Sequence, residues 1–198
     1  MKTSTLHLER DPQEILTLTF DRVDEKANVI DALFVEDFER AIAELHEQTP
    51  RGVILRSTKK SFFAGADIDM IFEVQRGGER QLFELVERLK SNLRRLETMG
   101  VPVVACLEGA ALGGGWEIAL SAHHRIALNS ASVKVGLPEV NLGLLPGGGG
   151  VARTVRLFGL QAALPLLTEG KRYSAKEALE NHLIHELVSS PEEVLFKA

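Results

Sequence analysis

The sequence predicts an α/β fold, and three observations carry that prediction. Two short apolar runs, 52–57 and 102–107, have the length and composition of buried strands. An amphipathic helical pattern precedes each run, as expected where right-handed crossovers join parallel strands. Clusters of glycine and proline then separate the segments at turns. Periodicity alone indicates alternating strands and helices, and it does not arrange them into sheets.

The first half of the chain predicts a strand hairpin followed by two helices. Residues 6–9 and 15–21 alternate apolar and polar side chains around Asp11–Pro12. Asp31 is the expected N-cap of the first helix, and Pro50 ends it. The second helix spans 79–98 and ends before Gly100. Its expected inward-facing side chains are Leu82, Leu85, Val86, Leu89, Leu93 and Leu96.

The second half alternates glycine-rich turns with shorter elements. The expected elements are a turn at 109–115, helices at 116–121, 151–158, 161–168 and 175–181, a strand at 124–127 and a loop at 140–150. Pro191 and the acidic residues after it resemble a helix start, but the chain stops about two turns later. We therefore expect residues 1–198 to form one domain trimmed at the C-terminus from a longer polypeptide.

Composition narrows the possible functions. The chain has 198 residues, of which 44% are hydrophobic and 26% charged, enough for one domain with a substantial core. A formal net charge of −5 without long runs of like charge argues against binding nucleic acid. Cys106 lies within an apolar run and reads as a buried strand residue in a reducing compartment. Since neither a signal peptide nor a membrane span is expected, the predicted location is the cytoplasm.

Two glycine–glutamate motifs predict an anion site with its own acid and base. Gly113–Gly115 leave backbone amides open to close approach, and Glu117 follows them. The second motif is Gly136-Leu-Pro-Glu139. Amides aimed at one point stabilise an oxygen that gains negative charge, and two carboxyl groups can move protons beside it.

With a third motif, these segments resemble the crotonase superfamily in its enoyl-CoA hydratase/isomerase branch. The motifs are Ser61-Phe-Phe-Ala-Gly-Ala-Asp-Ile68, the segment 109–117 and the segment 136–150. The resemblance extends over roughly residues 16–188. Segments 136–159 and 168–172 are similar in finer detail to the N-terminal hydratase part of bifunctional fatty-acid oxidation proteins.

The resemblance implies both a fold and an activity. The fold is a spiral of repeated β-β-α units, here lacking the C-terminal helices. The activity is a lyase reaction that hydrates trans-2-enoyl-CoA to 3-hydroxyacyl-CoA in fatty-acid β-oxidation. An additional enoyl-CoA isomerase activity would also fit the family. The chain would form a homotrimer or part of a longer bifunctional polypeptide. Its substrate would be an acyl-CoA thioester, with no separate cofactor, because CoA is part of the substrate, and no metal.

The family pattern also assigns roles to residues. The backbone amides of Ala66 and Gly114 would form the oxyanion hole for the thioester oxygen. Glu139 would donate a proton to the α-carbon, while Glu117 would orient and activate water. The remaining substrate contacts would come from Ala27, Asn28, Ala64, Gly65, Asp67 and Ile68 for CoA, and from Leu112 and Trp116 for the acyl chain.

Some expectations concern the edges of the site. Asp67 reads as a turn residue rather than a catalyst, and Trp116 is large enough to shorten the acyl pocket. Lys59 is one of the cations that could meet the CoA phosphates. Leu142 and Leu144 fit either the acyl channel or the core.

Other functions fit parts of the same pattern. The alternatives are an enoyl-CoA δ-isomerase, an acyl-CoA thioester hydrolase and a non-catalytic acyl-CoA-binding fragment. The paired glutamates argue against the binding fragment, because binding alone does not need an acid and a base. Residues 147–152 also match a loose dinucleotide-binding pattern. Pro146 stands where that pattern needs a strand, so a loop beside the acyl site is the preferred interpretation.

Overall fold

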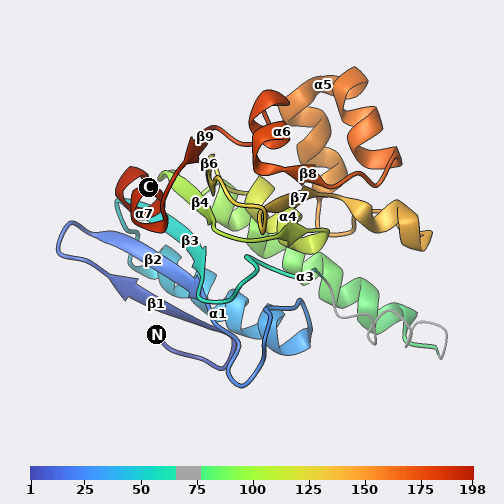
Figure 1. Cartoon of the computed structure of the whole chain (residues 1–198). Helices are drawn as coiled ribbons and strands as arrows, with labels where there is room; N and C mark the ends of the chain where they lie inside the picture. The colour runs from blue at the N-terminus through green and yellow to red at the C-terminus, as the bar shows by residue number, and fades with distance from the viewer. Residues whose placement is uncertain (66–76) are drawn as a thin grey trace.

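The computed structural model describes residues 1–65 and 77–198. Its elements alternate between strands and helices along most of the chain (Figure 1). In order they are β1 Leu6–Arg10, β2 Ile15–Phe20, α1 Ala32–Glu47, β3 Gly52–Ser57, α3 Glu79–Glu97, β4 Val103–Leu107, β5 Ala111–Leu112, α4 Gly114–Leu120, β6 His124–Leu128, β7 Lys134–Gly136, the 3₁₀ helix η1 Pro138–Leu142, α5 Gly150–Thr168, β8 Tyr173–Ser174, α6 Ala175–Glu180, β9 Glu186–Val188 and α7 Pro191–Lys197.

Two sheets organise these elements. The larger sheet has the strand order β1-β2-β3-β4-β6-β9, and its neighbouring strands are parallel except in the β1–β2 hairpin. The smaller sheet has the order β5-β7-β8. Helices α1 and α3 pack against each other, while α5 and α6 lie together at the far end of the molecule from β1 and β2 (Figure 1). The predicted α/β class is confirmed.

The chain winds between the sheets as a spiral of β-β-α units. β4 enters the larger sheet, β5 the smaller one, and α4 closes the unit. β6 and β7 repeat the pattern and are followed by η1 and α5. Phe63 forms an isolated parallel bridge to Ala111, which puts the segment after β3 at the edge of the smaller sheet. The ends of β5 and β7 thereby meet beside the start of α4.

Local signals set many boundaries as predicted, and tertiary contacts moved others. Asp31 caps α1 by accepting a hydrogen bond from the Phe34 N–H, and Ser174 caps α6 in a capping box. Gly159, with φ 77°, interrupts α5 between the two predicted helices. The predicted turn 109–115 instead contains β5, and α4 begins at Gly114, within the predicted turn.

Helix α3 divides its apolar face between two environments. Leu89, Leu93 and Leu96 are buried in the core as predicted. Val86 and Leu82, about one and two turns before Leu89, are half-buried and line a pocket, whose wall Leu89 also reaches. The helix therefore links the core to the candidate site.

Arg125, on β6, is a fully buried cation, 1% exposed. Its Nη1 donates to the Ala122 carbonyl and its Nε to the Leu183 carbonyl, each at 2.8 Å. Its backbone N–H donates to Nδ1 of His185, and its carbonyl accepts from the His185 N–H. No carboxylate of the described residues forms an ion pair with it, and burial lowers the pKa of Arg125 to about 10. This side chain ties the segment after α6 to the larger sheet.

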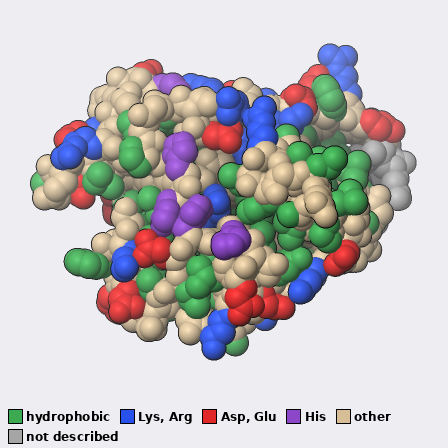
Figure 2. Space-filling view, turned by 90° about the horizontal axis from the view of Figure 1, so that it is seen from above, with side chains coloured by type: hydrophobic (Ala, Val, Ile, Leu, Met, Phe, Trp, Pro, Cys, Tyr) green, Lys and Arg blue, Asp and Glu red, His purple; other side chains and the backbone are tan. Residues whose placement is uncertain are grey.

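Hydrophobic side chains also gather on part of the surface seen from above (Figure 2). Exposed leucines on α5 include Leu157, Leu160 and Leu164, and Leu145 lies on the preceding loop. Among the helices of the described residues, none is both long and apolar enough to cross a membrane.

Candidate active site

A largely apolar pocket of about 500 Å³ lies where α3, the β5–α4 turn and η1 meet. It brings together six of the twelve predicted site residues: Ala64, Gly65, Leu112, Gly114, Glu117 and Glu139. The lining residues come from α3, segment 64–65, segment 112–117, η1, the loop after it and the approach to β8. They include Ala64, Gly65, Leu82, Leu85, Val86, Leu112, Gly113, Gly114, Glu117, Glu139, Asn141, Leu142, Leu144, Gly147, Gly148 and Arg172.

The two glycine–glutamate motifs lie side by side because β5 pairs with β7. Leu112 is in register with Gly136, and the Gly113 N–H donates to the Gly136 carbonyl at 3.0 Å. Gly113 has φ 55°, a conformation that favours glycine, and it turns the chain into α4. Gly114 is the first residue of α4, so its N–H has no acceptor within the helix. That amide belongs to a pocket-lining residue.

Glu117 is a buried carboxyl group, 3% exposed, held by the backbone of another loop. Its Oε2 accepts from the Gly148 N–H at 2.9 Å and its Oε1 from the Gly150 N–H at 2.6 Å. A β-carbon on either glycine would come within 2.8 Å of the carboxylate oxygens. Burial raises the pKa of Glu117, whereas these two hydrogen bonds and the nearby Arg153 charge lower it.

Glu139 has a different environment in the same pocket. Its Oε2 is buried without a hydrogen-bond partner among the described residues. Burial first, and the negative charge of Glu117 in addition, raise the pKa of Glu139 to about 7. Near neutral pH, one pocket therefore presents a firmly held carboxyl group and a second one poised to exchange a proton.

The segments predicted to hold CoA are neighbours. The Ala64 N–H donates to the Asn28 carbonyl, and the Ile30 N–H donates to the Gly65 carbonyl, each at 2.9 Å. Ala64 and Gly65 line the pocket, whereas Ala27 does not. Ala66, Asp67 and Ile68 lie outside the described residues. Their assigned roles stay predictions.

Asn28 is placed as a scaffold residue rather than a pocket wall. It is 2% exposed, and its Oδ1 accepts from the Arg22 N–H at 3.0 Å. Its Nδ2 donates to Ser57 Oγ at 2.9 Å and lies 3.3 Å from the carbonyls of Phe20 and Phe62. The side-chain amide is fully occupied within the protein, so the contact of Asn28 with CoA stays a prediction for its backbone groups.

Trp116 lies in the core rather than in the wall of this pocket. It is 3% exposed, packs in the hydrophobic core and is not one of the pocket-lining residues. Consecutive residues of a helix point in different directions, so Glu117 faces the pocket while its neighbour faces the core. Leu112, Leu142 and Leu144 do line the pocket.

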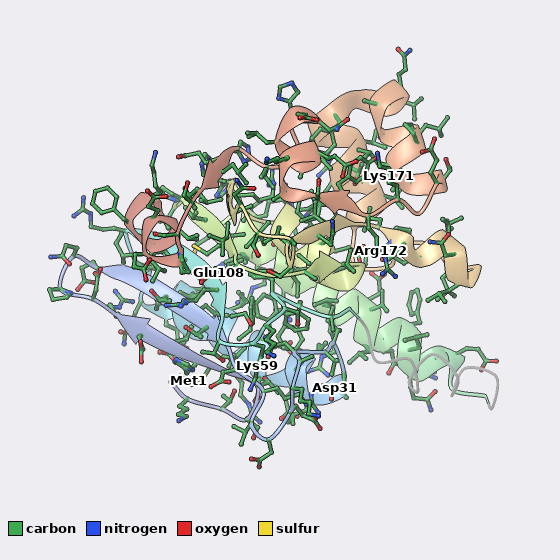
Figure 3. The ribbon with its side chains drawn as sticks, in the orientation of Figure 1. Met1, Asp31, Lys59, Glu108, Lys171 and Arg172 are labelled. Carbon is green, nitrogen blue, oxygen red and sulfur yellow. The ribbon has the colours of Figure 1, made fainter. Side chains whose placement is uncertain are left out.

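Three basic residues near the site refine the sequence analysis. Lys59 lies with its Nζ 2.8 Å from Asp21 Oδ1, so its charge already has a partner. Arg172 comes from the segment leading into β8, beside Lys171, and lines the pocket (Figure 3). Arg153, on α5, donates to the carbonyl of Gly148, whose N–H in turn donates to Glu117. Neither arginine has a role in the sequence analysis, although Arg153 and Arg172 lie in the segments 136–159 and 168–172 that carry the finer resemblance.

Known structures share this architecture. An enoyl-CoA hydratase from Bacillus halodurans superposes with a TM-score of 0.89 at 27% identity, covering 98% of this chain and 77% of that one. An enoyl-CoA hydratase from Bacillus anthracis gives 0.85 at 30% identity, covering 98% and 74%. The fold is therefore that of the crotonase class of enzymes.

Sequence comparison leads to the family. The chain matches the enoyl-CoA hydratase/isomerase family over residues 10–198, and it belongs to that family. It is 38% identical over 195 residues to the fatty acid oxidation complex subunit alpha of Shewanella sp. (strain MR-4), and 39% identical over 186 residues to that of Shewanella oneidensis. These matches cover 98% and 93% of this chain, but only 27% and 26% of the length of the relatives.

Proposed function

We propose that this chain hydrates trans-2-enoyl-CoA to 3-hydroxyacyl-CoA. The observation that carries the proposal is the presence of Glu117 and Glu139 in one apolar pocket, where the two carboxyl groups have different hydrogen-bonding environments. Glu117 is fixed by two backbone N–H groups, whereas Glu139 has a raised pKa and a buried oxygen without a hydrogen-bond partner in the described part of the chain. Addition of water needs both a group that directs the water and a group that delivers a proton.

In the proposed reaction, the thioester oxygen accepts hydrogen bonds from the amides of Ala66 and Gly114. These donors stabilise the enolate more than the ground-state carbonyl, and one such donor is worth about 3 kcal/mol. Glu117 takes a proton from water as the water oxygen bonds to the β-carbon. Glu139 gives its proton to the α-carbon as the enolate collapses. The product gains one water, and the proton difference between the glutamates is restored through solvent.

Isomerisation of a 3-enoyl-CoA is the nearest alternative within the family. It needs one residue to carry a proton between the α- and γ-carbons, and Glu139 alone would suffice. A second carboxyl group fixed at the pocket wall favours hydration. We also propose that the domain works in β-oxidation as part of a longer polypeptide, supported by the relatives of which it spans about a quarter. The proposed location is the cytoplasm.

Product analysis tests the proposal. The purified chain is incubated separately with crotonyl-CoA, a 3-enoyl-CoA and a saturated acyl-CoA, and the products are identified by mass spectrometry. Formation of 3-hydroxybutyryl-CoA from crotonyl-CoA is expected. Three outcomes would contradict hydration. Double-bond migration alone would indicate an isomerase, release of free CoA alone a thioester hydrolase, and binding without turnover a non-catalytic binding fragment.

A further inference from the structure

Arg153 holds the loop that holds Glu117. Its Nη1 donates to the Gly148 carbonyl at 3.1 Å, and the Gly148 N–H donates to Glu117 Oε2 at 2.9 Å. The arginine is 6% exposed and does not line the pocket. One loop residue is thus fixed from both sides, by the carboxylate in front and the guanidinium behind.

The local backbone is shaped around this guanidinium. A β-carbon on Gly149 would lie 2.4 Å from Arg153 Nη1, so only glycine leaves room for the contact. The Arg153 N–H also donates to the Gly149 carbonyl at 3.0 Å. From α3, Glu97 places Oε2 3.5 Å from Nη2. The arginine therefore connects α3, the start of α5 and the glycine loop.

We propose that Arg153 is a positioning residue for the hydration reaction: it holds the 148–150 loop against Glu117 and so fixes the direction of that carboxylate in the pocket. The inference rests on the proposed function. Arg153 acts through the loop and touches no substrate atom, so its loss should change turnover more than substrate binding.

Its charge adds a second, measurable effect. Around Glu117, positive charges come from Arg153 on α5 and Lys90 on α3, and the carboxyl group of Glu139 faces it from η1. Around Arg153, the charged groups are Glu97 and Arg94 on α3 and Glu117 itself. Because Arg153 lowers the pKa of Glu117, its removal should raise that pKa. Less of Glu117 would then be ionised near neutral pH.

The test compares Arg153→Gln and Arg153→Lys with the control Arg94→Gln. Arg94 forms an exposed ion pair with Glu97 but contacts neither the loop nor Glu117. For Arg153→Gln we expect kcat on crotonyl-CoA to fall about tenfold, KM to stay within about twofold, and the acid limb of the pH–rate profile to move up by about half a unit or more. Arg153→Lys keeps the charge and should move the limb less. Arg94→Gln should match the unchanged protein.

A direct titration separates this inference from the proposed function. The carboxyl carbon of Glu117 is followed by ¹³C NMR in the substrate-free chain, assigned by its loss in Glu117→Gln. A higher pKa in Arg153→Gln than in Arg94→Gln supports the inference. If Arg153→Gln lowers the melting temperature but leaves both the titration and the pH–rate profile of the folded protein unchanged, Arg153 is scaffold only and the inference falls. A chain inert toward crotonyl-CoA overturns the proposed function, while the titration still tests Arg153.

Discussion

Oε1 of Glu139 lies against Gly113, where a β-carbon on the glycine would approach it to 3.1 Å. Gly113, with φ 55°, is also the N-cap residue of α4 and precedes Gly114, whose amide is the proposed oxyanion donor. The proposed acid and this donor are therefore placed by one turn of backbone. A small change at that turn would disturb both.

Glu139→Gln should abolish hydration and double-bond migration together. The amide keeps the shape of the side chain but has no proton to give to the α-carbon, and we expect kcat to fall about 1000-fold or more. Crotonyl-CoA and a 3-enoyl-CoA are the substrates to compare. Near-normal turnover of crotonyl-CoA by this variant would refute the role of Glu139. Glu117→Gln should impair hydration more than migration.

Gly148→Ala should reduce hydration without disrupting the fold. The added methyl group would lie 2.8 Å from Glu117 Oε2 and push the carboxylate off its two N–H donors, so we expect kcat to fall about 100-fold. Gly147→Ala is the matched variant, since its β-carbon would meet only Val86, at 3.6 Å. Equal losses in the two variants would contradict a specific effect on Glu117.

Hydration should fall as pH rises through about 7. Glu139 must be protonated to act as the proton donor, and its pKa is raised to about 7 by burial first and by the charge of Glu117 second. Removing that charge in Glu117→Gln should therefore lower the pKa of Glu139 and move the alkaline limb of kcat/KM to lower pH. The charge of Glu117 acts on Glu139, so a shift of this limb reports the interaction between the two groups. An alkaline limb that stays in place would show that they do not interact.

Asn28→Ala should destabilise the fold. The buried amide links the backbone at Arg22 to Ser57, and its loss leaves partners unsatisfied, at a cost of about 2 to 3 kcal/mol in the free energy of unfolding. Urea denaturation measures the change. The matched variant Asn129→Ala removes an exposed amide and should stay within about 0.5 kcal/mol. If Asn28→Ala unfolds like the unchanged chain but raises KM, a direct substrate contact would be the better reading.

Val86→Phe and Trp116→Phe should have different effects, because Val86 lines the pocket and Trp116 packs in the core. The first adds volume at the pocket wall, so kcat/KM for a long-chain enoyl-CoA should fall about tenfold relative to crotonyl-CoA. The second removes volume from the core and should cost about 1 to 2 kcal/mol in stability without changing chain-length preference. A changed preference in Trp116→Phe alone would restore the original expectation for that residue.

Much of the fold followed from local signals in the sequence. Asp31 and Pro50 mark the ends of α1 through a cap and a breaker, and the bounds of β3 agree with the predicted 52–57. The pairing of β5 with β7 carries no comparable local signal. Two-residue strands are defined by their partners, so the start of α4 was predicted two residues too late.

The candidate site was predictable where a motif specifies backbone geometry. Gly114, Glu117 and Glu139 lie in glycine-rich motifs, and all three line the pocket. Side-chain direction is harder to predict. The periodicity of α3 shows which face is apolar but not that Val86 meets a cavity while Leu93 meets the core. Nothing in the sequence around Arg153 indicates that its guanidinium folds back onto a loop carbonyl.

Arg125 has a consequence for local unfolding. Its buried charge rests on carbonyl oxygens at Ala122 and Leu183, so the segment around Leu183 cannot detach without leaving a guanidinium in apolar surroundings or drawing water into the core. Opening of that segment is therefore coupled to opening of the sheet beneath it. Backbone amides near His185 should exchange with deuterium about as slowly as those of β6.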